Sequence, residues 1–195
     1  MQLRRPKKNF AFIDSQNLNL GTQKVGWKMD WQKFLAYLRS EHNVSDAYLF
    51  IGYMQEHEDM YKQLHDLGYL VVLKPTVGMF DTHGTESKQR STQGKSTNQD
   101  QENGARRVVK GNIDAELVLY AMKQLPKYHQ AVIVSGDGDF YCLAEYLEEK
   151  KRLKAILAPN WQYSSLLKPY ERYIVRLDQL RTRLEHKDYR RRPKR

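Results

Sequence analysis

The sequence predicts an α/β protein in which helices cover both faces of a central, mostly parallel sheet. Short apolar runs alternate along the chain with segments whose apolar residues recur at helical spacing. Glycine or proline follows several of these segments, as expected where a helix or strand ends. Because a crossover helix is the usual connection between parallel strands, this alternation indicates a parallel sheet.

The chain before residue 75 contains three expected strands and two expected helices. Asp30 precedes the first helix as an N-cap, and Gly68 ends the second. Pro75 closes the third strand because proline has no N–H to donate to a sheet. In chain order we expect a strand over 10–14, a helix over 31–38, a strand over 47–54, a helix over 59–67 and a strand over 69–73.

The chain after residue 112 continues the alternation, with Pro126 after its first helix and Pro159 after its second strand. In chain order we expect a helix over 113–125, a strand over 131–134, a helix over 140–150, a strand over 153–158, a strand over 173–177 and a last helix to about residue 185. Residues 78–107 break the rhythm with a polar run. A flexible loop is expected there, either simply disordered or acting as a flap over a substrate.

The composition bounds the class of protein. With 195 residues, of which 40% are hydrophobic, the chain suits one domain with a real core, placed over 9–185. The single cysteine, Cys142, excludes a disulfide framework within one chain and favours a reducing compartment. No apolar run approaches the roughly 20 residues of a membrane helix, and no signal-peptide pattern follows the basic N-terminus. We therefore expect a soluble, cytoplasmic protein with no membrane partner.

The net charge of +10 is concentrated at the two ends of the chain. Residues 1–8 carry +4 and residues 186–195 carry +5, which leaves +1 for everything between them. Basic tails raise the affinity for a phosphate polymer by releasing counterions, or they serve only solubility. The charge pattern favours nucleic acid as the partner.

Acidic side chains follow two of the expected strands. Asp14 ends the first strand, and Asp137 and Asp139 follow the strand over 131–134. In open α/β sheets, ligands bind beyond the carboxyl ends of the strands, at the point where the strand order reverses. If these two strands are neighbours, the three carboxylates meet at one crevice.

A fourth acid, Asp114, lies on the expected helix over 113–125. It shares a helical face with Leu117, Val118 and Ala121, which form the stripe that faces the core. A carboxylate on that face is costly unless it is paired or binds a metal ion. Glu116 lies on a different face of the helix from Asp114 and is expected to be exposed to solvent. It is therefore a weaker candidate than Asp114 for the acidic site.

Aspartates that converge without histidine or cysteine suit a hard cation such as Mg²⁺ or Mn²⁺, which also relieves their repulsion. Such a site serves phosphoryl transfer or phosphodiester hydrolysis. Each residue alone has a structural alternative: Asp137 as an N-cap, Asp139 as a first-turn acid, and Asp14 in an Asx-turn. Their shared location with Asp114 favours a functional site. Lys110, just before the Asp114 helix, is either a solvated loop lysine or a residue that meets a substrate phosphate at the helix N-terminus.

Three motifs together resemble the NYN domain, in the LabA-like branch of the PIN-like nuclease superfamily. They are FIDSQNL at 12–18, KGNID at 110–114 and VSGDGDF at 134–140, and the resemblance covers roughly residues 9–180. It implies a three-layer α/β/α sandwich with a metal-dependent ribonuclease site, and a reaction that leaves a 5′-phosphate and a 3′-hydroxyl. The residues carried over are the metal-site acids Asp14, Asp114, Asp137 and Asp139, with Asn17 beside the first aspartate and Ser135 supporting the turn after the fourth strand.

The sequence therefore predicts a Mg²⁺- or Mn²⁺-dependent endoribonuclease acting on RNA, with single-stranded RNA as the expected substrate. Asn17, Lys110 and Ser135 are the expected substrate-binding residues. The alternative is a non-catalytic RNA-binding or scaffold module in which the acids are structural remnants. A Mg²⁺-dependent phosphatase ranks last, because the Asp-x-Asp pair of such enzymes is missing. Gln16 stands where the second aspartate of the pair, two residues after Asp14, would be. Whether the chain forms a homodimer stays open.

Overall fold

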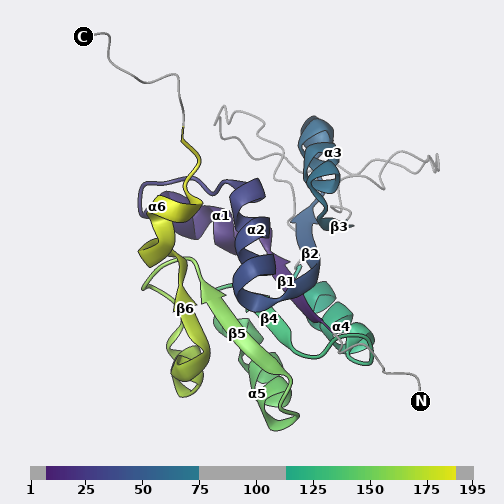
Figure 1. Ribbon diagram of the computed structural model, residues 1–195, viewed down its shortest axis with the longest axis vertical. Helices are drawn as coiled ribbons and strands as arrows, with labels where there is room; N and C mark the ends of the chain where they lie inside the picture. The colour runs from purple at the N-terminus through teal and green to yellow at the C-terminus, as the bar shows by residue number, and fades with distance from the viewer. Residues whose placement is uncertain (1–7, 75–112, 188–195) are drawn as a thin grey trace, which may run out of the picture.

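The computed structural model of the chain describes residues 8–74 and 113–187. Its centre is a six-stranded sheet in the order β3-β2-β1-β4-β5-β6, in which every pair of neighbours is parallel. The α/β fold expected from the sequence is therefore confirmed (Figure 1). The strands are β1 (Asn9–Asp14), β2 (Val44–Gly52), β3 (Leu70–Lys74), β4 (Ala131–Val134), β5 (Leu153–Ala158) and β6 (Ile174–Arg176).

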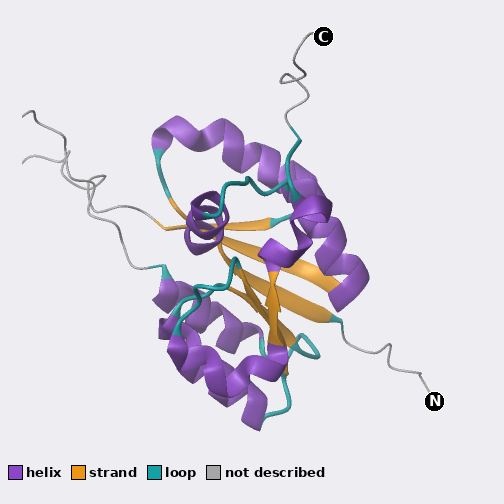
Figure 2. Ribbon diagram, turned by 90° about the vertical axis from the view of Figure 1, so that its left-hand side faces the viewer, coloured by secondary structure: helices purple, strands orange, loops and turns teal. Residues whose placement is uncertain are grey.

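In the described residues, six α-helices surround the sheet: α1 (Ser15–Lys24), α2 (Trp31–His42), α3 (Glu58–Leu67), α4 (Asp114–Gln124), α5 (Tyr141–Glu149) and α6 (Arg181–Leu184). Buried residues of α1, α2, α3 and α6 share one core cluster with the sheet. Buried residues of α4 and α5 share the other. The sheet is thus the middle of three layers, and Figure 2 shows the strands between the two groups of helices.

Alternate residues of the central strands fill the two cores. On β1, Ala11 and Ile13 face the first cluster, whereas Phe10 and Phe12 face the second. All six residues of β1 are buried, as are all four of β4. This full burial is what a strand covered on both faces requires, and it explains why these strands appear in the sequence as continuous apolar runs.

The strand order reverses between β1 and β4, which lie side by side with Phe10 opposite Ala131 and Ile13 opposite Val134. In the sheet, β2 and β3 lie beyond β1 on one side, and β5 and β6 lie beyond β4 on the other. The two strands that carry the predicted acids are therefore neighbours. Their carboxyl ends flank the crevice that this topology leaves for ligands.

Local signals set several helix ends. The Asp30 side chain caps α2 by accepting from the Lys33 N–H at 3.1 Å, as predicted. Gly68 ends α3 in the left-handed region, with φ of 102°. Asn43 ends α2 in the same region at φ of 51°, so this helix runs four residues beyond its predicted end at residue 38.

One α-helix of the described segments was not predicted. α1 follows β1 directly, and its buried positions are Ser15, Leu18 and Thr22, of which only one is apolar. The expected strands and the other helices are present within a few residues of their predicted bounds. The predicted loop over 78–107, Lys110 and most of both basic tails lie outside the described residues.

Candidate functional site

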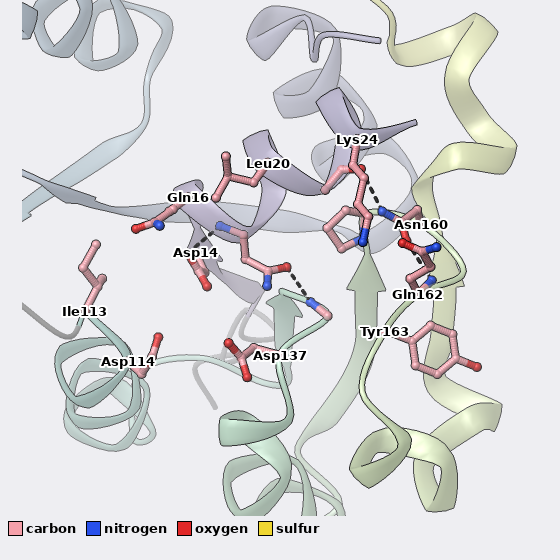
Figure 3. Close-up of a pocket in the computed structure, with 14 residues that line it drawn as sticks. Asp14, Gln16, Leu20, Lys24, Ile113, Asp114, Asp137, Asn160, Gln162 and Tyr163 are labelled. Atoms are coloured by element: carbon pink, nitrogen blue, oxygen red, sulfur yellow. Dashed lines mark hydrogen bonds between the residues drawn. The ribbon is translucent and has the colours of Figure 1, made fainter. Parts of the chain in front are cut away.

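A pocket of about 460 Å³ opens beyond the carboxyl ends of β1 and β4. Three of the four predicted acids line it, namely Asp14, Asp114 and Asp137. They come from three separate segments of the chain: the end of β1, the start of α4 and the turn after β4. Figure 3 shows Asp114 and Asp137 opposite each other below Asp14. The tertiary fold therefore brings together the acids that the sequence analysis selected.

Asp14 is the most deeply held of the three, with only 6% of its surface exposed. One carboxylate oxygen accepts from the Asn17 N–H at 3.0 Å and so caps α1. The other accepts from the Ser135 hydroxyl at 3.3 Å. Burial raises the pKa of Asp14, and these hydrogen bonds oppose the rise by favouring the ionised form.

A set of hydrogen bonds ties the end of β1 to the turn after β4. Ser135 Oγ donates to Asp14 and accepts from the Asp137 N–H at 3.2 Å. Asn17 Oδ1 accepts from the Gly136 N–H at 2.9 Å. Both side chains predicted to bind substrate thus form hydrogen bonds inside the protein. Their arrangement fixes the Asp14 carboxylate relative to the backbone that carries Asp137.

Asp114 is the first residue of α4 and is half-buried at the end of the stripe formed by Leu117 and Ala121. Its pKa is raised to about 6, first by burial and then by the negative charges of Asp14, Asp137 and Asp139. The positive charge of Lys74 acts in the opposite direction. Part of this rise in pKa therefore reflects repulsion between Asp114 and the neighbouring acids.

Asp139 and Glu116 lie at the margin of this arrangement. Asp139 is exposed and does not line the pocket, although its charge contributes to the raised pKa of Asp114. Its backbone N–H donates to Asp137 Oδ1 at 3.1 Å, so Asp137 also caps the short helix Gly138–Phe140. Glu116, expected to be exposed, is half-buried and forms an ion pair with Lys74 at 2.7 Å.

The pocket has a further wall that the sequence analysis missed. The segment after β5 contributes Asn160, Gln162 and Tyr163, and the last turn of α1 contributes Lys24. Asn160 follows the carboxyl end of a strand next to β4, so the rule that found Asp14 and Asp137 could have found it. Lys24 had no such signal, because α1 itself was not expected.

The oxygen donors of this pocket fit a hard divalent cation. Asp14, Asp114 and Asp137 supply carboxylates, and none of the described histidine or cysteine residues lines the pocket. The mutual repulsion expressed in the pKa of Asp114 is what such a cation would relieve. Within residues 8–74 and 113–187, no three acidic, histidine or cysteine side chains are close enough to hold a metal by themselves. Mg²⁺ retains several waters and binds through one or two carboxylates, so the donor set remains compatible with it.

The three-layer α/β/α arrangement of this chain is consistent with a PIN-like or NYN domain. The chain belongs to the NYN domain family, whose model matches residues 10–177. This membership suggests a nuclease-type or RNA-related function, because NYN domains are generally nucleases. In the described part of the chain, no helix is long and apolar enough to cross a membrane.

Two comparisons extend this result. The chain is 26% identical over 185 residues to the Low amplitude and bright protein LabA of Synechococcus elongatus, covering 93% of this chain and 89% of that protein. Among solved structures, it is similar to a protein of unknown function from Vibrio parahaemolyticus, with a TM-score of 0.66 and 19% identity. That match covers 95% of this chain and all of the other, and it supports the fold alone.

Proposed function

We propose that the protein is a Mg²⁺- or Mn²⁺-dependent endoribonuclease that hydrolyses phosphodiester bonds of single-stranded RNA. The observation that carries the proposal is the convergence of Asp14, Asp114 and Asp137 in one pocket at the switch point of the sheet. The raised pKa of Asp114 supports it, because structural acids are seldom placed where they repel one another.

Asp14, Asp114 and Asp137 are the residues that would hold the cation, with water completing its coordination. When bound, the cation polarises a phosphate oxygen and acidifies the attacking water. Asp139 supports this set from outside the pocket through its charge.

The side chains around the cation would have separate roles in the reaction. The Asp114 carboxylate would complete the negative charge around the cation and orient the attacking water. Ser135 and Asn17 hold the Asp14 side chain and the Asp137 turn in place. Lys24, exposed at the pocket wall, supplies a cation for a substrate phosphate, a role that the sequence analysis gave to Lys110 and the basic tails.

The test is cleavage of a labelled, mixed-sequence single-stranded RNA in Mn²⁺, in Mg²⁺ and in EDTA. Wild type is compared with Asp14→Asn and Asp137→Asn, which remove a charge with little change of shape. Asp66→Asn is the matched control, since this acid is exposed on α3 and lies outside the pocket. We expect metal-dependent cutting in wild type and in the control, loss of at least about a hundredfold in the two pocket variants, and products with 5′-phosphate ends.

The second candidate is a non-catalytic RNA-binding module of the same fold. The observation that favours it is the lack of a ready three-carboxylate cluster among the described residues. In that case the wild type binds RNA in a salt-sensitive manner but shows no cutting with either metal. Cutting that persists equally in EDTA or in both pocket variants would also overturn the nuclease proposal.

A further inference from the structure

A second cavity, of about 340 Å³, adjoins the acidic pocket. Lys24 and Gln162 line both cavities, so the two are contiguous on the surface. The second cavity differs in chemistry from the first, because two tryptophans, Trp27 and Trp161, and the guanidinium of Arg181 line it. No predicted motif covers it, and the nuclease chemistry proposed above does not use it.

Trp161 is the most informative residue of this second cavity. Its side chain is 53% exposed, although tryptophan is a residue that folding normally buries. The guanidinium of Arg176 lies over its ring at 5.8 Å from the centroid. Asp178 holds that guanidinium by two hydrogen bonds, of 3.1 Å from Nε and 2.6 Å from an Nη. The ring therefore has one ordered cationic neighbour and keeps a large area in contact with solvent.

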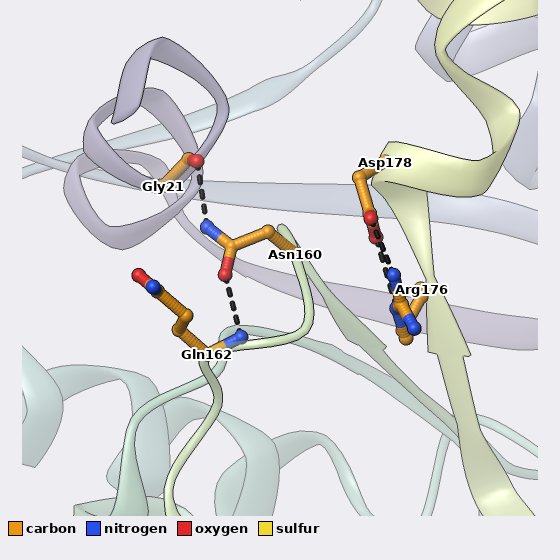
Figure 4. Close-up of polar contacts among 5 residues, drawn as sticks. All are labelled: Gly21, Asn160, Gln162, Arg176 and Asp178. Atoms are coloured by element: carbon orange, nitrogen blue, oxygen red, sulfur yellow. Dashed lines mark hydrogen bonds and ion pairs between the residues drawn. The ribbon is translucent and has the colours of Figure 1, made fainter. Parts of the chain in front are cut away.

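The backbone on both sides of Trp161 is held in place, as Figure 4 shows for its two neighbours. Asn160 is buried, and its Nδ2 donates to the Gly21 carbonyl of α1 at 2.7 Å. Its Oδ1 accepts from the Gln162 N–H at 2.7 Å. A rigid turn thus displays the indole, so little entropy would be lost when a flat ligand stacks on it.

The polar groups of the cavity are suited to a nucleotide. The carboxylate of Asp178, which also lines the cavity, is already bound by the Arg176 guanidinium. Lys24 lies between the two cavities and forms no ion pair with any residue in these same two ranges. Trp161 and Lys24 together offer an exposed aromatic ring beside a cation, the combination by which proteins bind single-stranded nucleic acids.

We propose that Trp161 is a base-stacking platform for one nucleotide of single-stranded RNA, next to the scissile phosphodiester, with Lys24 contacting the phosphate between them. This inference rests on the proposed ribonuclease function and gives that site its preference for unpaired RNA. Stacking on an aromatic ring tolerates any base but requires that the base be unstacked from its neighbours. A duplex cannot meet that requirement without opening.

The test measures binding in EDTA, so that cleavage does not interfere. The probes are a fluorescein-labelled uridine decanucleotide and the same length of abasic ribose-phosphate chain. Wild type is compared with Trp161→Ala, with Trp161→Phe, which keeps an aromatic ring, and with Leu119→Ala, a change at a similarly exposed residue on α4 outside both cavities. Circular dichroism verifies that each variant is folded.

We expect Trp161→Ala to weaken binding of the uridine probe about 5- to 100-fold and to leave binding of the abasic probe unchanged. Trp161→Phe and Leu119→Ala should bind within about threefold of wild type. Intrinsic tryptophan fluorescence should be quenched by the uridine probe in wild type and in Leu119→Ala, but not in Trp161→Phe. Equal losses for both probes, or wild-type affinity in Trp161→Ala, would overturn the proposal.

The two proposals fail in different ways. If Trp161→Ala cleaves RNA with the rate and KM of wild type, the stacking platform is refuted and the nuclease proposal stands. Conversely, Trp161-dependent binding of the uridine probe by a wild-type protein that never cleaves RNA would refute the nuclease and uphold the platform.

Discussion

Replacing Asp114 by asparagine should make the metal-free protein more stable at neutral pH while abolishing cleavage. In the folded protein the pKa of Asp114 is raised from 3.8 to about 6 by burial and by three neighbouring acids. The difference corresponds to about 3 kcal/mol for a fully shielded group. Because Asp114 is only half-buried, screening by solvent reduces this to about 1 to 2 kcal/mol. Asparagine has nearly the same shape and no charge, so the folded variant lacks the destabilisation that the ionised Asp114 causes in wild type.

The pH dependence of the gain follows from the direction of the shift. A carboxyl group whose folded pKa is raised holds its proton more tightly in the folded state. Its favourable contribution is complete below pH 3.8 and is lost as the pH rises through about 6. The advantage of Asp114→Asn over wild type should therefore be near zero at pH 4 and complete at pH 8. For a chain of this size it amounts to a rise in Tm of about 2 to 8 °C.

The assay is thermal unfolding in EDTA at pH 4, 6 and 8, repeated at pH 8 with saturating Mg²⁺. Bound Mg²⁺ should stabilise wild type more than the variant and so narrow the gap at pH 8. The exposed acid Asp66 on α3 provides the control variant Asp66→Asn, whose Tm should differ little from wild type at every pH, because its contact with His65 is an exposed ion pair. A variant that is less stable than wild type at pH 8, or equally stabilised at pH 4 and pH 8, would refute the electrostatic reasoning.

Three other results are expected. The cleavage rate at limiting Mg²⁺ should fall as the pH drops through about 6, because Asp114 must be ionised; a flat profile from pH 5 to 8 would contradict this. Asp14→Ala should lower the free energy of unfolding, measured by urea denaturation, by about 1 to 3 kcal/mol, because α1 loses its cap and Ser135 loses its acceptor. Asp14→Asn should lower it by under about 1 kcal/mol. Gly21→Ala would place a Cβ 2.5 Å from the Pro159 Cβ, and in the same assay should cost about 1 to 3 kcal/mol; an unchanged midpoint would show that α1 and this loop separate freely.

The sequence alone was enough to predict the sheet and most helices, for a clear physical reason. Strands buried on both faces need continuous apolar runs, and Phe10–Asp14 and Ala131–Val134 have them. The caps at Asp30 and Gly68 act locally, so their side-chain or backbone preference is visible without a tertiary structure. The acids at strand ends followed from a rule of topology, and the neighbouring positions of β1 and β4 agree with it.

The helix α1 could not be predicted in this way. Its inward face includes Ser15 and Thr22, so hydrophobic periodicity is nearly absent. Its place is secured by contacts that are distant in sequence: Gly21 lies against Pro159, and its carbonyl accepts from Asn160. Tertiary packing, rather than local pattern, makes this segment helical.

What the sequence by itself determined is the succession along the chain of the strands and of the α-helices other than α1, together with the acids Asp14, Asp114 and Asp137 that line the pocket. Burial patterns and strand ends are encoded locally, which is why these features could be predicted. Only the tertiary structure decided which groups surround these acids. The mutual repulsion at Asp114, the placement of Lys24 beside the pocket and the display of Trp161 on a fixed turn depend on segments far apart in the chain. Distances between such segments follow from how the layers pack, and no local pattern of residues specifies them.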